Sequence, residues 1–184
     1  MIAGTHHPKD GRLPSGIAGL DQLLDGGFVI GGVYLVMGTP GAGKTTLGNQ
    51  CCFSLAARGQ KAVYLSLLTE SQSRMLANLQ GMAFFDPSAI GGSIAYVGGY
   101  LVLRERRLAG LFQLIRKVLS DEQPTLLVID GVTASMRDGD AAAREFIADL
   151  QLLSDSTGCT TLLLANMSST DANSAEHSMV DGML

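Results

Sequence analysis

The chain has 184 residues, of which 46% are apolar and 16% are charged, and its formal net charge is −4. The length suits one domain and excludes two full ones, and the apolar fraction excludes a disordered or fibrous chain. Because a charged fraction of about 25% is usual, we expect an interface to cover part of the surface.

Charge is unevenly distributed along the chain. All 13 lysines and arginines lie at or before Arg144, whereas acids continue as far as Asp181. The purely anionic C-terminal part disfavours a basic nucleic-acid groove there. The sequence has no apolar run of about 18 residues and no signal-peptide pattern, so we expect a cytoplasmic protein without a membrane-spanning segment.

Five apolar runs of strand length alternate with longer helical patterns. The runs, rich in leucine and β-branched residues, are 33–37, 62–67, 94–97, 126–129 and 161–165. The helical patterns are at about 44–58, 71–80, 105–120 and 139–156. This alternation predicts an α/β fold with a mostly parallel sheet flanked by helices on both faces. Three cysteines, none in a metal-ligand spacing, are predicted to be free buried thiols.

The two ends of the chain differ from its middle. Residues 1–12 are polar and are predicted to be a flexible lead-in to one domain over 13–184. The segment 179–184 looks like the opening of another strand. We therefore expect the C-terminal end of the domain to be incomplete, with its final strands truncated.

The clearest motif directly follows the first predicted strand. Residues 38–45 read GTPGAGKT, a full match to the G-x-x-x-x-G-K-[ST] phosphate loop. A strand, a glycine-rich turn and a helix start direct backbone N–H groups at a phosphate. Lys44 can reach the β- and γ-phosphates, and the Thr45 hydroxyl can bind Mg²⁺. The predicted ligands are ATP and Mg²⁺, and the predicted nucleotide-binding residues are Gly38, Thr39, Pro40, Gly41, Ala42, Gly43, Lys44, Thr45 and Thr46.

A second acidic site is expected, because Mg²⁺ needs a carboxylate near its water shell. The run 124–130 reads PTLLVID, in which apolar residues end in Asp130 at the carboxyl edge of a strand. This is the layout of a Walker B motif, and it predicts that Asp130 contacts the metal together with Thr45. An aspartate that opens a turn before Gly131 is the alternative.

Hydrolysis also needs a group that orients or deprotonates water. Glu70, just past the second predicted strand, is the acid in that place and is predicted to be catalytic together with Lys44. The alternative is that Glu70 favours the positive end of a helix that Thr69 or Ser71 caps. Asn166, at the end of the fifth run, is a candidate sensor of the γ-phosphate or a turn residue.

Together these residues resemble the KaiC-like branch of the RecA superfamily of P-loop ATPases, over nearly the whole chain. The lead-in 13–27 (LPSGIAGLDQLLDGG), the Walker B run 128–133 (VIDGVT) and the closing segment 176–182 (EHSMVDG) carry the resemblance. It implies a RecA-like sheet, ATP bound at subunit boundaries, a ring-shaped and often hexameric homo-oligomer, and a protein partner.

The sequence departs from the family pattern at two places. KaiC-like domains usually carry two adjacent glutamates after the second strand, whereas this chain has Thr69 and Glu70, which implies slow hydrolysis. The family's basic residues that reach into the neighbour's ATP fall past Leu184. Of the two acceptor places of self-phosphorylating members, Ser178 falls near one and His177 near the other, so we do not expect kinase activity.

We therefore predict a Mg²⁺-dependent, regulatory ATPase that assembles through its nucleotide sites, with no nucleic-acid partner. One alternative is a RecA-like DNA recombination or repair ATPase. Segments 132–143 and 167–178 disfavour it, because they offer only Arg137 and the nearby Arg144 and no aromatic platform for bases. The other is an ATP sensor that does not hydrolyse its ligand. The basic cluster at 104–107 is interpreted as a solvated helix start, with a phosphate or DNA contact as the alternative.

Overall fold

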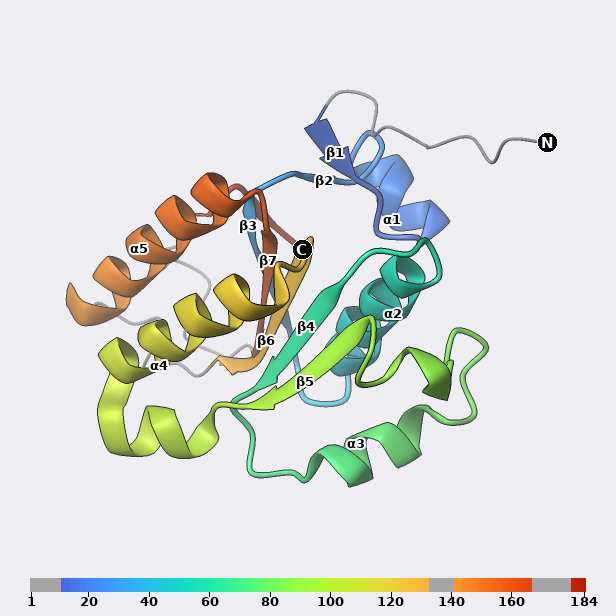
Figure 1. The fold of residues 1–184 in the computed structure, drawn as a ribbon. Helices are drawn as coiled ribbons and strands as arrows, with labels where there is room; N and C mark the ends of the chain where they lie inside the picture. Colours follow the sequence, from blue (N-terminus) through green and yellow to red (C-terminus); the bar gives the residue numbers. More distant parts are fainter. Residues whose placement is uncertain (1–10, 133–140, 167–179) are drawn as a thin grey trace.

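The computed structural model describes residues 11–132, 141–166 and 180–184. Its centre is a sheet of six strands, in the spatial order β5-β4-β6-β7-β3-β8, and every neighbouring pair is parallel (Figure 1). The strands are β3 (Val33–Gly38), β4 (Ala62–Ser66), β5 (Ile94–Gly98), β6 (Leu126–Val132), β7 (Thr160–Asn166) and β8 (Gly182–Met183). The five predicted apolar runs correspond to β3 through β7, which confirms those strands.

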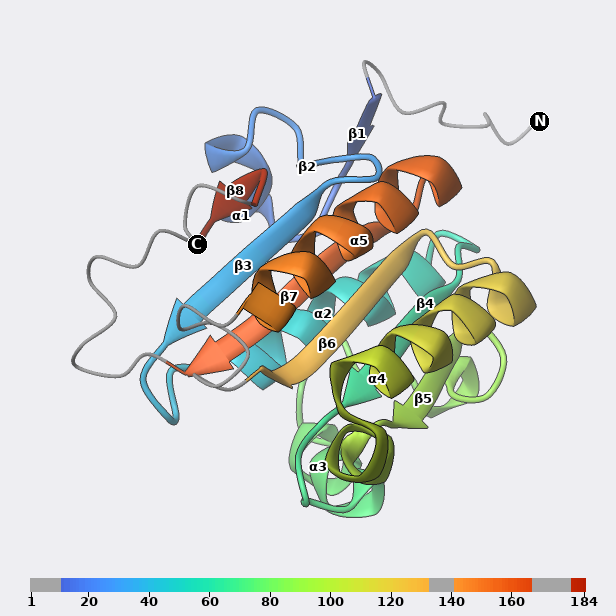
Figure 2. The ribbon, with the colours of Figure 1, turned by 90° about the vertical axis from the view of Figure 1, so that its left-hand side faces the viewer.

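Helices cover both faces of this sheet. They are α2 (Lys44–Ala56), α3 (Gln72–Leu79), α4 (Tyr100–Glu122) and α5 (Ala141–Thr157), with a short 3₁₀ turn at Pro87–Ala89. Figure 2 shows α4 and α5 side by side on one face, with α2 behind the sheet on the other. The predicted α/β class is confirmed. No helix in the described ranges is long and apolar enough to cross a membrane.

Strand residues alternate between two apolar clusters, one on each face of the sheet. Val63 and Leu65 of β4 face the cluster that includes Leu111 of α4. The residue between them, Tyr64, belongs to the opposite cluster together with Phe53 of α2. Because both faces are covered, the strands read as continuous apolar runs in the sequence. The three cysteines are free and buried, as predicted.

The N-terminal part of the domain packs beside the main sheet. β1 (Arg12–Leu13) pairs antiparallel with β2 (Phe28–Val29), and α1 (Ala18–Leu23) lies between them in sequence. Arg12, assigned to the lead-in by its polarity, pairs with Val29 in this ribbon. The carboxylate of Asp21 accepts hydrogen bonds from the backbone N–H groups of Ser15 and Gly16 at 2.7 and 3.1 Å.

Helix α4 differs from its predicted extent of 105–120. It begins at Tyr100, and Arg107 interrupts it with φ 56° and ψ −162°. The first turns were missed because Tyr100 and Leu101 are exposed, so that no buried apolar face marks them. Non-helical backbone at a residue with a Cβ produces the bend near the start of α4 in Figure 1.

The last described residues, 180–184, add an edge strand, as the sequence of 179–184 predicts. β8 pairs with β3, with Tyr34 opposite Gly182. The carboxylate of Asp181 accepts a hydrogen bond of 2.8 Å from the backbone N–H of Val33. The N–H of Met37 donates to the carbonyl of Leu184 at 2.8 Å. These contacts fix residues 181–184 beside the strand that leads into the phosphate loop.

Candidate functional site

The phosphate loop connects β3 to α2 and is shaped by two glycines. Gly41 and Gly43 have φ values of 83° and 88°, a left-handed conformation that costs free energy in residues with a Cβ. Gly43 is also the residue that precedes the first turn of α2. The loop therefore ends where the first backbone N–H groups of a helix have no partner within the helix, which is a favourable place for an anion.

Lys44 lies at the mouth of this loop and is half-buried. Its Nζ donates hydrogen bonds to the carbonyl oxygens of Gly38 and Thr39 at 2.8 and 2.9 Å. In the described part of the chain, Lys44 forms no ion pair. Its positive charge is thus paired with neutral carbonyls, which phosphate oxygens can replace.

Thr45 and Asp130 are brought together from α2 and β6. The Thr45 hydroxyl donates to Oδ2 of Asp130 at 2.8 Å, and the phenol of Tyr64 donates to the same oxygen at 2.6 Å. The predicted strand end at 129 is wrong, because β6 continues to Val132 with an irregularity between Asp130 and Val132. Gly131, with φ 95°, makes this bulge possible.

The surroundings of Asp130 fit a magnesium ion. Asp130 is 4% exposed, and no cation in the described ranges forms an ion pair with it. A buried carboxylate that only neutral donors compensate is costly, and a divalent cation would supply the missing charge. A hydroxyl and a carboxylate are oxygen ligands of the kind that Mg²⁺ prefers. Among the described residues, no group of three or more His, Cys, Asp or Glu is placed to hold a metal ion.

Five of the nine predicted nucleotide-binding residues line one cavity of about 260 Å³, whereas Gly38, Thr39, Pro40 and Ala42 are not among its lining residues. It brings together Lys44, Thr45, Asp130 and Asn166, and its remaining walls come from Gly41, Gly43, Thr46, Leu68, Gly131 and Leu164. Asn166 is exposed at the end of β7 and stands opposite Gly38 in the strand register. The cavity therefore joins the phosphate loop to the carboxyl ends of two other strands.

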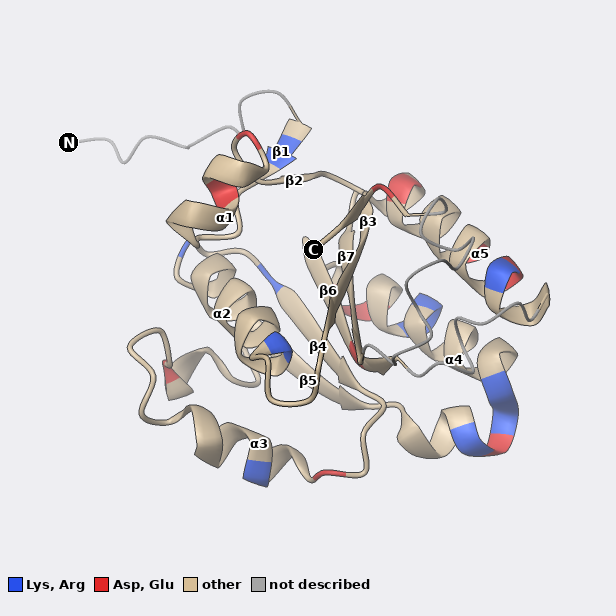
Figure 3. Cartoon of the chain, turned by 180° about the vertical axis from the view of Figure 1, so that it is seen from behind, with Lys and Arg blue, Asp and Glu red and all other residues tan. Residues whose placement is uncertain are grey.

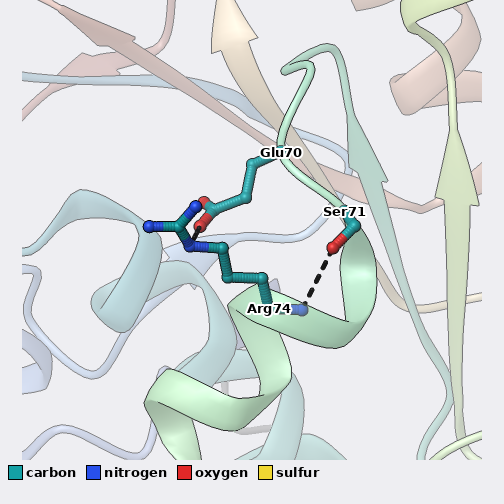
Figure 4. Close-up of polar contacts among 3 residues, drawn as sticks. All are labelled: Glu70, Ser71 and Arg74. Atoms are coloured by element: carbon teal, nitrogen blue, oxygen red, sulfur yellow. Dashed lines mark hydrogen bonds and ion pairs between the residues drawn. The ribbon is translucent and has the colours of Figure 1, made fainter.

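Glu70 lies next to this cavity rather than in it. It lines an adjoining cavity of about 90 Å³, which shares Thr45, Leu68 and Asp130 with the larger one. The Oε1 atom of Glu70 is 3.5 Å from Nε of Arg74. The Ser71 hydroxyl caps α3 by accepting from the N–H of Arg74 (Figure 4). Ser71 therefore caps α3, as the alternative interpretation expects. Glu70, next to this cap, borders the site.

Two residues at the site, Tyr64 and Arg74, did not emerge from the motifs. A tyrosine in the middle of a buried strand needs a partner for its hydroxyl, and this signal points to a polar group nearby. Arg74 stands four residues after Glu70 at the start of a predicted helix, which is the spacing of a side-chain ion pair. Which polar group Tyr64 reaches depends on strand order, which spacing along the chain does not reveal.

Burial and electrostatics keep the Tyr64 phenol protonated. Desolvation by burial, followed by the negative charge of Asp130, raises the pKa of Tyr64 well above its ordinary range. The phenol is therefore a hydrogen-bond donor at every physiological pH. A short bond from a hydroxyl to a carboxylate is among the stronger hydrogen bonds in proteins.

Comparison with known proteins agrees with this geometry. The family model for the KaiC ATPase matches residues 13–184. A UPF0273 protein of Thermotoga maritima is 28% identical over 191 aligned residues, which cover 94% of this chain and 78% of the relative. A UPF0273 protein of Pyrococcus horikoshii is 28% identical over 172 residues, which cover 85% of this chain and 69% of the relative.

The DNA repair protein RadA of Synechocystis is 33% identical over 129 residues, which cover 67% of this chain. The match spans only 25% of RadA. The six-stranded parallel sheet with helices on both faces is consistent with a RecA-like fold. The predicted resemblance is confirmed, and the chain belongs to the KaiC family of ATPases.

Proposed function

We propose that this ATPase domain binds Mg-ATP at the phosphate loop, hydrolyses it slowly, and acts as a regulatory ATPase that assembles through its nucleotide sites. The observation that carries the proposal is the contact of 2.8 Å between Thr45 and Asp130, in the cavity that Lys44 and Asn166 also line. A hydroxyl, a buried carboxylate and a lysine at the N-terminus of a helix form a site for a metal-bound polyphosphate.

Each residue has a role that its position supports. Lys44 exchanges its two carbonyl partners for β- and γ-phosphate oxygens, and Thr45 and Asp130 hold the Mg²⁺. When bound, Mg²⁺ neutralises charge on the phosphates. Asn166 donates to the γ-phosphate and so distinguishes ATP from ADP.

Glu70 is proposed to polarise the attacking water from the adjoining cavity. Water and γ-phosphate then react in line, with positioning and charge neutralisation as the main contributions. Glu70 must leave or share its exposed ion pair with Arg74 to reach a water near Thr45, which slows hydrolysis only modestly. A single glutamate after Thr69 supports slow hydrolysis.

Assembly into a homo-oligomeric ring is supported by the surface. Large apolar side chains are exposed at Leu23, Leu101 and Leu152, with 83%, 57% and 71% of their surface accessible. Single exposed apolar residues also occur on monomers, and here they support assembly together with the low charged fraction of 16%. The phosphate cavity lies at the carboxyl ends of β6 and β7, and we propose that a neighbouring subunit completes it. Self-phosphorylation is not part of the proposal; His177 and Ser178 lie outside the described residues.

DNA binding is the second candidate, because the DNA repair protein RadA matches part of this chain. Figure 3 shows basic residues, in blue, gathered on the first turns of α4. There Arg104, Arg106 and Arg107 are exposed, and Arg104 lies 5.8 Å from the ring centre of Tyr100. A basic cluster beside an exposed aromatic ring suits single-stranded nucleic acid. The formal net charge of −4 argues against nucleic-acid binding.

Light scattering with and without Mg-ATP tests the proposal, with phosphate release measured on the same samples. We expect ATP to convert a smaller species into a ring and phosphate to appear slowly. A protein that stays monomeric and releases no phosphate contradicts both parts. Titration with fluorescent single-stranded DNA at low salt decides the second candidate, since tight and salt-sensitive binding would favour a DNA repair role.

A further inference from the structure

The side chain of Tyr64 reaches the metal site from within the core. Tyr64 has no exposed surface, and its hydroxyl donates to Oδ2 of Asp130 at 2.6 Å. Its ring is held by packing: the ring centre of Tyr96 is 5.5 Å away, and a Cβ at Gly48 would lie 3.4 Å from its Cε2. The Tyr64 hydroxyl therefore has a fixed position beside the Asp130 carboxylate.

The geometry points to Tyr64 as a positioning residue for Mg²⁺: its phenol fixes the Asp130 carboxylate, and through it the Thr45 hydroxyl, in the arrangement that binds the metal. This inference rests on the proposed function of the site and names a residue that tunes it. Both donors bind to Oδ2, so neither of these bonds uses the other carboxylate oxygen. Because the Thr45 hydroxyl donates its hydrogen bond to Asp130, the lone pairs of its oxygen are left for the metal.

Without Tyr64, the carboxylate keeps one side-chain hydrogen-bond partner among the described residues, Thr45, whose hydroxyl must also bind the ion. The carboxylate is then free to turn about its last side-chain bond, and a buried charge loses one of its two donors. Groups that hold a metal ligand from behind in this way change metal affinity by about 10- to 100-fold when they are removed. A phenol held by packing is a strong support of this kind, because it has few rotatable bonds.

A second chain of hydrogen bonds holds the backbone of Thr45. The Asn49 side-chain amide donates to the Thr45 carbonyl at 2.8 Å, and the Tyr96 hydroxyl donates to the Asn49 amide oxygen at 2.7 Å. Thr45 is thus fixed at its main chain through α2 and at its hydroxyl through Asp130. The freedom that remains in the Thr45–Asp130 pair is rotation of the carboxylate. The hydrogen bond from Tyr64 removes this freedom.

Tyr64→Phe tests the inference, because it removes the hydroxyl and keeps the ring. Binding of a ribose-labelled fluorescent ATP analogue is measured without metal and over a range of Mg²⁺ concentrations. We expect metal-free binding within about twofold of the parent and a half-saturating Mg²⁺ concentration about tenfold higher. If the half-saturating Mg²⁺ concentration does not change, the inference is overturned. It is also overturned if nucleotide binding without metal weakens as much as binding in the presence of Mg²⁺.

Tyr34→Phe is the matched control. Tyr34 is a buried tyrosine whose hydroxyl accepts from the Val29 N–H at 2.8 Å, away from the phosphate loop. It also loses one hydrogen bond, but we expect its Mg²⁺ dependence to equal that of the parent. A Mg²⁺ shift as large as that of Tyr64→Phe contradicts a specific role of Tyr64.

Asp130→Asn, alone and combined with Tyr64→Phe, completes a double-mutant cycle. If Tyr64 acts through the Asp130 charge, Tyr64→Phe adds little further loss of Mg²⁺ dependence once that charge is gone. Additive losses overturn the inference. The combined variant also serves if Tyr64→Phe does not fold, because it no longer buries a charge that lacks a donor.

Phosphate release in the same samples separates this inference from the proposed function. If the parent binds Mg-nucleotide and releases no phosphate, hydrolysis fails while a Mg²⁺ shift in Tyr64→Phe still supports the role of Tyr64. If Mg²⁺ does not strengthen nucleotide binding by the parent, the metal site and the inference are both overturned.

Discussion

Thr45 and Asp130 are 85 residues apart in the sequence and are joined by a hydrogen bond of 2.8 Å between their side chains. The bond links the first turn of α2 to β6 in the middle of the sheet. The two side chains thus hold each other in place within the folded domain. A pair fixed in advance loses less conformational freedom when it binds a metal, which favours tighter binding.

Asp130→Asn is expected to separate stability from function. The asparagine oxygen can still accept from Thr45 and Tyr64, so the free energy of unfolding in urea should stay within about 1 kcal/mol of the parent. Loss of the negative charge should lower Mg²⁺-dependent phosphate release by about 100-fold or more. A variant that hydrolyses Mg-ATP as fast as the parent would show that Asp130 has no part in metal binding.

Gly48 is expected to be required for the packing of α2 on the sheet. A Cβ at this position would lie 2.9 Å from Leu164 Cδ1 and 3.0 Å from Val128 Cγ1. Gly48→Ala should therefore lower the free energy of unfolding by about 1 to 3 kcal/mol. Gly19→Ala, in α1 with nothing within 4 Å of its Cβ, is the control and should be neutral or stabilising by up to about 1 kcal/mol. Equal effects in urea unfolding would contradict this account of the α2 interface.

Arg74→Gln tests how strongly the ion pair restrains Glu70. The Arg74 side chain is 80% exposed, and solvent-exposed pairs of this spacing contribute about 0.3 to 0.5 kcal/mol. We expect the rate of phosphate release to change by less than about threefold in either direction, since a pair of that strength shifts populations only modestly. A change of tenfold or more would mean that the pair controls the reaction.

The buried cysteines are expected to make stability fall at alkaline pH. Burial raises the pKa of Cys51 and of Cys159 from 9.0 to about 12. Between these values an unfolded chain releases thiol protons that the folded chain retains, so the free energy of unfolding decreases as pH rises from about 9 towards 12. Urea unfolding at several pH values measures this slope.

A Cys159→Ala variant provides the comparison, because it removes one of these thiols from the core. Its slope over the same pH range should be shallower than that of the parent. The same burial should protect all three thiols from a disulfide reagent at pH 8 until the protein is unfolded. Rapid labelling of the folded protein would contradict this.

Much of the fold could be predicted, because its strands are buried on both faces. Runs such as 126–129 stand out as continuous apolar segments and correspond to β6. The start of α4 could not be predicted, since Leu101 is 57% exposed and no periodic face marks the turns before Arg107. Strand order was likewise beyond the sequence, because each strand is compatible with several neighbours.

For the site, residues within one motif were easier to predict than contacts between motifs. Lys44 and Thr45 follow from the phosphate loop, and Asp130 follows from an apolar run that ends in an acid. That Tyr64 reaches Asp130 depends on β4 lying beside β6, with Ser66 opposite Asp130 in the register. The pairing of Glu70 with Arg74 depends on where α3 begins, and Ser71 decides this as its cap.

Single-turnover phosphate release from Mg-ATP, with bound nucleotide measured on the same sample, tests the central claim most directly. Glu70→Gln is compared with the parent, and Glu122→Gln is the control, because Glu122 pairs with Lys61 outside both cavities of the site. The account predicts that Glu70→Gln binds ATP like the parent but releases phosphate at least about 100-fold more slowly, while Glu122→Gln matches the parent. Equal rates for Glu70→Gln and the parent, or no release by the parent at all, would contradict it.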